Sequence, residues 1–215
     1  MKVKVIGIVA GGPQVDLPPL DHYKDINMWV GVDFGAYILS QILGNFDLAV
    51  GDFDSVDNKE FKMIESKASQ IEKHPTDKDD TDLELAIQMA IELNPDQVYI
   101  FGATGGRKDH EWINIMLLKK FNESGIEAWI CNNQNEITLK KPGHYQLKRD
   151  DRFQYVSFLP ISESVHNLSL KGFLYELDDT TVMSGSSLTV SNQWNEKIGT
   201  YLFTEGILIV VKSRD

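Results

Sequence analysis

The sequence predicts an α/β fold: an N-terminal α/β domain built on a parallel sheet, followed by a C-terminal β-sandwich domain. Over the first ~135 residues, apolar strand runs alternate with amphipathic helix patterns, which is typical of a parallel sheet with covering helices. From about residue 136, short apolar runs separated by Gly, Asn, Asp and Ser follow one another without a helical period. Even spacing of this kind indicates a small β-sandwich or barrel.

We expect the domains to span residues 1–134 and 135–215, because the polar run Asn132–Asn135 separates two strand patterns. The strand patterns of the first domain are Val3–Val9, Trp29–Val32, Leu48–Val50, Gln70–Lys73, Val98–Phe101 and Ala128–Cys131. Those of the second are Ile137–Leu139, Tyr145–Leu147, Tyr155–Leu159, Leu168–Leu170, Phe173–Leu177, Ser187–Val190, Tyr201–Phe203 and Ile207–Val211. Gly172 and Glu205-Gly206 are expected at hairpin turns.

Three helices are expected in the first domain. The clearest begins at the capping box Thr81-x-x-Glu84 and places on one face the residues Leu83, Ala86, Ile87, Ala90 and Ile91. Another is expected to be capped by Asp109; its inward residues are Ile113, Met116 and Leu117. The third begins at Asp57, with Glu60 three residues on, and carries Phe61 and Ile64.

Composition excludes several classes of function. The net charge of −11 argues against nucleic acid or an anionic membrane as the main partner. The single cysteine, Cys131, excludes an internal disulfide and a Cys-rich zinc site. No apolar run approaches membrane-spanning length, and the first residues enter a strand pattern without a signal peptide. We therefore expect a cytoplasmic protein.

The residues able to do chemistry follow the predicted strands of the parallel sheet, where ligands of such sheets bind. Gly11-Gly12 follow the first strand, Asp33 and Gly35 the second, and Asp52 and Asp54 the third. A glycine-rich turn, Gly102–Gly106, follows Phe101.

Asp52 and Asp54 are the strongest candidates for metal ligands. Together with Asp33 and Asp82 they would form a group of four carboxylates, each pair repelling by about 3 kcal/mol at ~5 Å. Such a group holds protons or a cation, and Mg²⁺ prefers oxygen ligands. The alternative is turn and capping chemistry ahead of the helix at Asp57.

The segment Asp77–Asp82 is open to two interpretations. Its acids are explained by the helix dipole, since they lie before and inside a first helical turn. Lys78, which lies among them, is either a neutralising ion-pair partner or a phosphate contact.

The turn Gly102–Gly106 is the candidate phosphate site, because its glycines let backbone N–H groups approach a ligand and a helix N-terminus follows. Its residues Thr104, Gly105 and Gly106 precede Arg107, which suits bidentate phosphate binding. Asp109 would repel phosphate and fits a helix cap or a sugar contact. The alternative is a plain strand-to-helix connection. The Walker A pattern is absent.

Three other residues have structural interpretations. His110, inside the glycine-rich motif, is interpreted as structural rather than catalytic, and Cys131 as a buried core residue. Trp194, after Ser191-Asn192-Gln193, can stack on a flat heterocycle or pack in the core, and the residues alone favour the core.

Taken in order, these segments resemble the bacterial thiamine pyrophosphokinases over nearly the whole chain. The matching segments are Gly11-Gly12, Asp33–Ala36, Gly51–Ser55, Asp77–Asp82 with Glu84, Gly102–His110 with Asn114, and Ser191-Asn192. The resemblance implies a catalytic α/β domain and a thiamine-binding β-sandwich. It implies a homodimer with active sites between subunits, and transfer of pyrophosphate from ATP, with Mg²⁺, to the hydroxyethyl oxygen of thiamine, releasing AMP.

Residue roles follow from the same resemblance. It implies a catalytic set of Asp33, Asp52, Asp54 and Asp82, of which Asp52, Asp54 and Asp82 hold metal. Nucleotide contacts are implied for Lys78, Thr104, Gly105, Gly106, Arg107 and Asp109, and thiamine contacts for Asp54, Ser191, Asn192 and Trp194. The chain differs from the usual family pattern at Phe34, where a glycine is usual, and at Lys108, where an apolar residue is usual.

Two other functions fit parts of the sequence. Asp52-Phe53-Asp54-Ser55-Val56 also matches the motif of haloacid-dehalogenase-like phosphohydrolases, whose first aspartate is a nucleophile, although here it follows the third strand and not the first. A non-catalytic sensor of nucleotides or vitamins would use the same pocket without turnover.

Overall fold

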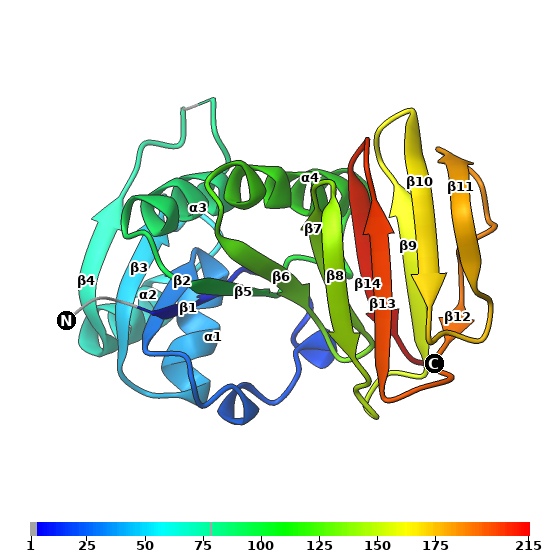
Figure 1. Ribbon diagram of the computed structural model, residues 1–215. Helices are drawn as coiled ribbons and strands as arrows, with labels where there is room; N and C mark the ends of the chain where they lie inside the picture. Colours follow the sequence, from blue (N-terminus) through cyan, green and yellow to red (C-terminus); the bar gives the residue numbers. More distant parts are fainter. Residues whose placement is uncertain (1–3, 78) are drawn as a thin grey trace. The chain divides into compact units, whose positions relative to one another are not determined.

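The computed structural model describes residues 4–77 and 79–215. The chain divides into two compact units, Met1–Asn133 and Gln134–Asp215 (Figure 1). In the described ranges, no helix is long and apolar enough to cross a membrane.

The first unit is built on a parallel sheet. Its strands are β1 (Val5–Val9), β2 (Met28–Val32), β3 (Phe46–Gly51), β4 (Ala68–Lys73), β5 (Gln97–Phe101) and β6 (Glu127–Cys131). Their order is β6-β5-β1-β2-β3-β4, and every pairing among them is parallel. All six strands predicted for this unit are present, and the predicted α/β class is confirmed.

Four α-helices lie in the connections between these strands. Parallel neighbours cannot be joined by a tight hairpin and need a crossover connection, which is usually a helix. They are α1 (Phe34–Ile42), α2 (Asn58–Lys67), α3 (Asp82–Glu92) and α4 (Lys108–Glu123), with short 3-10 turns at Gln14–Asp16 and Leu20–His22. Helices α1 and α2 pack together, as do α3 and α4. Figure 1 shows α3 and α4 along one side of the sheet and α1 on the other. The apolar faces of strands and helices therefore meet in a buried core.

The predicted starts of the helices are largely confirmed. At α2 the full capping box forms: the Asp57 carboxylate accepts from the backbone N–H of Lys59 and Glu60, and the Glu60 carboxylate accepts from the Asp57 N–H. At α3 only half of the predicted box forms, since Thr81 Oγ1 accepts from the Glu84 N–H while the Glu84 carboxylate pairs with Lys120.

Two predictions about α4 were wrong. Arg107, not Asp109, is the N-cap residue, and its side chain makes no capping hydrogen bond. The Asp109 carboxylate instead accepts from the Arg107 guanidinium, a charged partner, and from the His110 backbone N–H at 3.0 Å. Ile113, predicted to face inward, is 45% exposed, because it lies one turn before the buried part of the helix, where Leu117, Leu118 and Phe121 pack.

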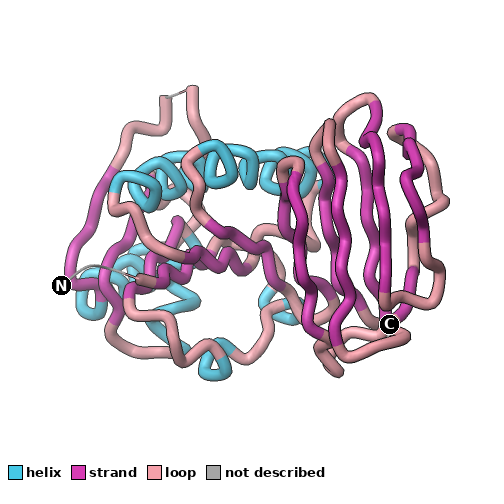
Figure 2. The backbone as a smooth tube through the Cα atoms, viewed as in Figure 1, coloured by secondary structure: helices cyan, strands magenta, loops and turns pink. Residues whose placement is uncertain are grey.

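The second unit consists of two antiparallel sheets, seen as adjacent magenta strands in Figure 2. Its strands are β7 (Asn135–Lys140), β8 (Gly143–Lys148), β9 (Tyr155–Pro160), β10 (Ser164–Lys171), β11 (Leu177–Met183), β12 (Asn192–Gln193), β13 (Ile198–Phe203) and β14 (Leu208–Ser213). One sheet runs β12-β9-β14-β7 and the other β11-β10-β13-β8. Residues of both sheets share one apolar core, as in a β-sandwich.

Two predicted strands of this unit were wrong. Residues 173–176 form a loop in which Phe173 makes an isolated bridge to Trp194, only Leu177 lies in a strand, and Ser187–Val190 is a turn. Strand β11 follows that loop and was missed, because its sequence Leu-Asp-Asp-Thr-Thr-Val-Met is mostly polar. Gly172 (φ 79°) connects the paired strands β10 and β11 as predicted. Gly206 (φ 95°) instead carries the chain from one sheet to the other.

Candidate active site

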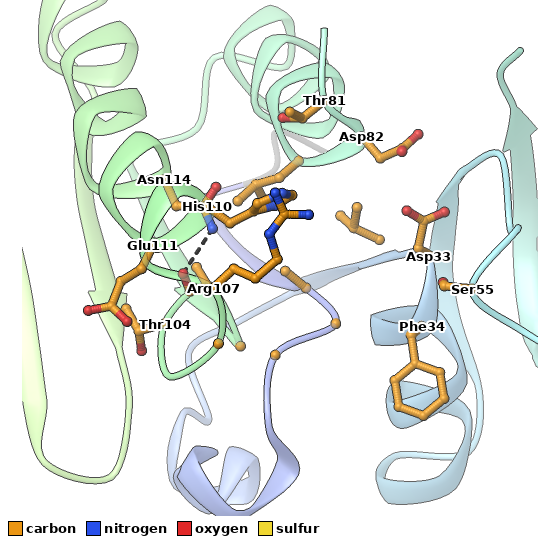
Figure 3. A pocket seen from close by; sticks show the side chains of 18 residues that line it. Asp33, Phe34, Ser55, Thr81, Asp82, Thr104, Arg107, His110, Glu111 and Asn114 are labelled. Carbon is orange, nitrogen blue, oxygen red and sulfur yellow. Dashed lines mark hydrogen bonds between the residues drawn. The ribbon is translucent and has the colours of Figure 1, made fainter. Parts of the chain in front are cut away.

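A cavity of ≈ 390 Å³ lies at the carboxyl ends of the parallel strands, as predicted (Figure 3). Strand order reverses between β1 and β5: the chain proceeds from β1 outward to β4 and then returns to the other side of β1. Loops that leave neighbouring strands in opposite directions open a crevice at such a point. The cavity is lined by the loops after β1, β2 and β5 and by the starts of α3 and α4.

Glycines make this crevice possible by letting backbone segments approach closely. A Cβ atom at Gly12 would lie 2.4 Å from the Gly102 carbonyl oxygen, and one at Gly35 would lie 2.0 Å from the Val9 carbonyl oxygen. The Gly12 N–H donates to the Gly102 carbonyl at 2.8 Å, which ties the loop after β1 to the loop after β5. Both glycines belong to motifs that the sequence shows, and the structure gives the steric reason for them.

Three of the four predicted acids come together. Asp33 follows β2, Asp52 follows β3 and Asp82 begins α3, and each offers an oxygen within 4.8 Å of the others. All three are half-buried. Figure 3 shows the Asp33 and Asp82 side chains at the same end of the cavity.

Asp33 is held in an unusual backbone conformation (φ 48°, ψ −119°). Its Oδ1 accepts a hydrogen bond of 3.1 Å from the Phe53 N–H. Strain of this kind, at a residue other than glycine, persists only where the surroundings impose it, and it is concentrated at functional sites.

The pKa of Asp33 is raised from 3.8 to about 7, chiefly by burial; the hydrogen bond from the Phe53 N–H lowers it, and the neighbouring Asp82 and Asp52 contribute to the rise. A carboxyl group with such a pKa is poised to exchange a proton or to bind a cation near neutral pH.

The fourth predicted acid, Asp54, lies outside this acidic cluster. It is exposed, and its backbone N–H donates to Asp52 Oδ1 at 3.0 Å. Phe53 between them has φ 62°, so the chain turns sharply after Asp52 and does not stay extended as the sequence interpretation required. Asp33, Asp52 and Asp82 thus form a donor set of carboxylate oxygens that fits a hard divalent cation such as Mg²⁺.

The glycine-rich turn forms the opposite wall of the cavity. Gly102 (φ 65°) and Gly105 (φ 88°) adopt the left-handed region that favours glycine. The turn is braced from within the unit, since Asn114 Nδ2 donates to the Ala103 carbonyl (dashed in Figure 3) and Asn132 Nδ2 donates to Thr104 Oγ1. Thr104 is buried, and its hydroxyl oxygen accepts this hydrogen bond from within the unit.

Charged groups around this turn are paired with one another. Arg107 is exposed and forms a two-bond ion pair with Asp109, which lowers the pKa of that carboxyl. The Glu111 carboxylate accepts from the Gly105 N–H at 3.0 Å and from Lys108 Nζ at 2.9 Å. Lys108, one of the two departures from the family pattern, thus has a local acidic partner.

Several cavity residues were missed by sequence reasoning or left without a role. Glu111 was not predicted, His110 was interpreted as structural, and Asn114 carried only the family resemblance. Their positions in the first turns of α4 were the available signal, since these turns face the glycine-rich loop. Phe34, the other departure, begins α1; its ring contacts Tyr37 and points away from the acids in Figure 3. Lys78 lies outside the described residues.

The predicted thiamine residues lie in the second unit. Ser191 is exposed and has φ 55°. Asn192 is 2% exposed and uses its amide inside the protein, since Oδ1 accepts from the Tyr175 and Gln193 N–H groups and Nδ2 donates to the Tyr175 carbonyl. Trp194 is half-buried, with its ring 5.4 Å from that of Phe173.

Fold and site together define a two-part α/β protein whose cavity lies at the switch point of a parallel sheet, with acids at one end and a glycine-rich turn at the other. Family models match both parts: "Thiamin pyrophosphokinase, catalytic domain" over residues 21–130 and "Thiamin pyrophosphokinase, vitamin B1 binding domain" over residues 144–208. The chain belongs to the thiamine pyrophosphokinase family.

Individual relatives agree. The chain is 41% identical over 215 residues to thiamine pyrophosphokinase of Bacillus subtilis, covering 99% of this chain and 100% of the relative. The crystal structure of the Bacillus subtilis protein matches with a TM-score of 0.92 at 40% identity over 99% and 100% of the two chains. The crystal structure of thiamin pyrophosphokinase from Geobacillus thermodenitrificans matches with a TM-score of 0.87 at 38% identity over 98% of each chain.

Proposed function

We propose that the protein transfers pyrophosphate from ATP to the hydroxyethyl oxygen of thiamine, giving thiamine pyrophosphate and AMP. The single observation that carries this proposal is the convergence of Asp33, Asp52 and Asp82, in a chain of this family, beside a cavity that Asp33, Asp82 and the turn Gly102–Gly106 line. Phosphoryl-type transfer depends mainly on positioning and on charge neutralisation, which these two walls are suited to supply.

The acids are the proposed metal ligands. Asp52 and Asp82, with Asp33 beside them, would hold Mg²⁺, and the exposed Asp54 is proposed as a further ligand. The metal supplies neutralisation of the charge on the phosphates. The carboxylates would fix the position of the metal and so of the phosphates, because they lie at the ends of β2 and β3 and at the start of α3.

The nucleotide is proposed to lie along the glycine-rich turn. Gly105 and Gly106 are exposed and leave their surface open to a phosphate group. Arg107 extends across the cavity in Figure 3, and binding of phosphate by its guanidinium would replace the present pairing with Asp109. Asp109 would then be available for a sugar hydroxyl, and Lys78 for a phosphate.

The chemical step is an in-line displacement. The hydroxyl oxygen of thiamine forms a bond to the β-phosphorus of ATP, the bond from that phosphorus to the oxygen bridging to the α-phosphate breaks, and AMP leaves with that oxygen. The hydroxyl proton passes to a carboxylate. Asp33 is the proposed acceptor, because its raised pKa of about 7 suits a general base near neutral pH.

Assembly and location complete the proposal. We propose a cytoplasmic homodimer with active sites between subunits. Ser191 and Asn192 of one subunit would bind the thiamine that reacts at the acidic cluster of the other, with Trp194 as a neighbouring aromatic residue. The family membership of both units supports this arrangement.

The test is to incubate the protein with thiamine and MgATP and to identify the nucleotide product. AMP, formed in equal amount with thiamine pyrophosphate, is the expected result. Formation of ADP would mean transfer of a single phosphoryl group, and inorganic phosphate without a thiamine product would mean hydrolysis. Asp52→Asn separates an enzyme from a sensor, since turnover should fall by at least about a hundredfold while thiamine binding changes little.

A further inference from the structure

We propose that Glu111 is an internal anion that occupies a phosphate position at the glycine-rich turn until the nucleotide displaces it, so that this side chain sets the affinity for ATP. The inference deepens the proposed function and rests on the proposed position of the nucleotide. Its basis is one hydrogen bond: the Gly105 N–H, in the candidate phosphate turn, donates to Glu111 Oε2 at 3.0 Å. Carboxylate and phosphate oxygens are both anionic acceptors, so a backbone N–H that holds one is suited to the other.

The Glu111 carboxylate is held in the way that proteins hold a bound phosphate. Its Oε2 accepts from Lys108 Nζ at 2.9 Å as well as from the Gly105 N–H, so a backbone donor and a cation meet at one oxygen. Glu111 lies in the first turn of α4, where the helix dipole favours negative charge. Backbone N–H groups at a helix start, with a cation beside them, form a ready anion site. In this structure a side chain of the protein fills that site.

The ion pair of Glu111 can be exchanged at small cost. The Lys108 side chain is 82% exposed and that of Glu111 is 24% exposed, and ion pairs in contact with water contribute little to stability. Glu111 lines the cavity, and Figure 3 shows it beside Thr104, on the side away from Asp33 and Asp82. A nucleotide that spans the cavity would therefore meet the acidic cluster at one end and Glu111 at the other.

A second carboxylate gives the reason why Glu111 has to leave. A Cβ atom added to Gly105 would lie 2.1 Å from Asp16 Oδ2, so the Asp16 carboxylate lies against the same glycine. A phosphate at the Gly105 N–H would meet two carboxylates if Glu111 stayed, and like charges at such distances repel. The Asp16 backbone is tied down, since its N–H donates to the Pro13 carbonyl and its carbonyl accepts from the Asn133 N–H. Glu111 is the carboxylate that can withdraw.

The next charge pair follows the same pattern. Both cations that directly follow the turn are paired with acids of the first turn of α4, Arg107 with Asp109 and Lys108 with Glu111. Lys108 stands where the family usually has an apolar residue, so this chain carries an added cation together with an internal competitor for it. Displacement of Glu111 by a phosphate would make the Lys108 ammonium available to that phosphate.

The alternative is that Glu111 only stabilises the start of α4, as acidic residues in a first turn do. Both interpretations predict a lower Tm when the carboxylate is removed, so Tm does not separate them. They differ in ATP affinity. Loss of a simple stabilising residue would loosen the turn and leave ATP binding unchanged or weaker, whereas loss of an internal competitor would make ATP bind more tightly.

The experiment measures the Kd of a non-hydrolysable MgATP analogue by calorimetry on the full-length protein, without thiamine. Glu111→Ala should lower this Kd about tenfold, as expected when one charge-assisted hydrogen bond no longer competes. Glu111→Asp keeps the charge but shortens the side chain by one methylene group, which takes the carboxylate away from the Gly105 N–H, and it should lower the Kd about threefold. The thiamine KM should change by less than about twofold in both variants.

Glu123→Ala is the matched control, because Glu123 pairs with Lys119 in the last turn of the same helix. It removes the same charge and should leave the ATP Kd unchanged. Lys108→Met should weaken ATP binding more in the Glu111→Ala background than in wild type, because in wild type the loss of the lysine also weakens the hold on the competing carboxylate.

The inference is overturned if Glu111→Ala leaves the ATP Kd unchanged or raises it, or if Glu111→Asp binds ATP as wild type does. A decrease of the Kd in Glu123→Ala as large as that in Glu111→Ala would also overturn it, since general loss of negative charge would then be the cause. An equal cost of Lys108→Met in the two backgrounds would exclude the exchange of partners. Failure of the wild type to form AMP from thiamine and MgATP would overturn the proposed function, whereas the Kd values, which need no turnover, test the inference separately.

Discussion

Gly51 determines whether Asp33 can reach the acidic cluster. A Cβ atom on Gly51 would lie 2.0 Å from Asp33 Oδ1, and its φ of 150° lies in a region that other residues rarely adopt. Gly51→Ala should therefore push the Asp33 carboxylate away from Asp52 and Asp82. We expect at least a tenfold loss of kcat/KM and a loss of stability of about 1–3 kcal/mol, measured by kinetics and by urea unfolding.

The control for Gly51 is Gly44, which also has a positive φ (78°) but lies in open space, since an added Cβ atom would meet none of the described residues within 4 Å. Gly44→Ala should lower the free energy of unfolding by about 1 kcal/mol and leave kcat/KM unchanged. Equal activity in the two variants would show that the position of Asp33 does not matter for turnover.

The raised pKa of Asp33 predicts that the stability of the protein depends on pH. Its pKa in the folded protein is about 7, above the ordinary 3.8, so the folded state binds this proton more tightly than the unfolded state does. Its contribution to stability is therefore fully present below pH 3.8 and is lost as the pH rises through about 7. In EDTA, the Tm of the wild type minus the Tm of Asp33→Asn should be smaller at pH 8 than at pH 5.

Mg²⁺ provides the check on this prediction, because a bound cation favours the ionised carboxylates and competes with the proton. Added Mg²⁺ should raise the wild-type Tm more at pH 8 than at pH 5, and it should raise that of Asp33→Asn less. A Tm difference between the two proteins that stays constant across this pH range would contradict the raised pKa.

At the scale of elements, α2 offers a clean test because its capping box lies close to the acids in sequence but outside the cavity. Asp57 accepts from two backbone N–H groups, at 2.7 and 2.9 Å. Asp57→Ala should destabilise the protein by about 1 kcal/mol, a Tm decrease of roughly 2–4 °C, with kcat/KM unchanged. Glu65→Ala, at an exposed position of the same helix, should change neither quantity; a loss of activity in Asp57→Ala would place α2 in the catalytic machinery.

The same elements explain how far the sequence predicts the fold. Helix α2 was found because Asp57 and Glu60 satisfy each other locally, and no distant contact is needed for that signal. Strand β11 was missed although its pairing with β10 is local, because most of its residues are polar and Asp178, Asp179 and Thr181 are exposed, so no alternating apolar pattern marks it. The loop before it was taken for a strand because Leu174 and Tyr175 are apolar, although they are exposed. Exposed apolar residues in a loop therefore mimic a strand pattern.

The site was predictable where it depends on strand ends and less so where it depends on side-chain partners. The convergence of Asp33, Asp52 and Asp82 follows from the parallel sheet, since carboxyl ends of its strands share one edge. The separation of Asp54 from them follows from the positive φ of Phe53, which no pattern reveals. The pairing of Arg107 with Asp109, in place of a helix cap, depends on one side-chain rotamer.

At the scale of the whole molecule, the residues proposed to bind metal and nucleotide and those proposed to bind thiamine lie in different units. The acids and the glycine-rich turn belong to Met1–Asn133, whereas Ser191 and Asn192 belong to Gln134–Asp215. Each unit has its own apolar core, so a substitution in one binding surface need not disturb the other. Defects of the two units can therefore be placed on separate chains and combined.

Such a combination tests the proposed inter-subunit active site. In a dimer of one Asp52→Asn chain and one Ser191→Ala chain, one site would carry both defects and the other would carry neither. Random exchange of equal amounts makes half of the dimers mixed, so activity at low thiamine should recover to about a quarter of wild type. Asp52→Asn mixed with Asp82→Asn should recover nothing, because both defects lie in the acidic cluster and every site has one. If each active site were built within one subunit, the first mixture would give only the average of its two inactive parents.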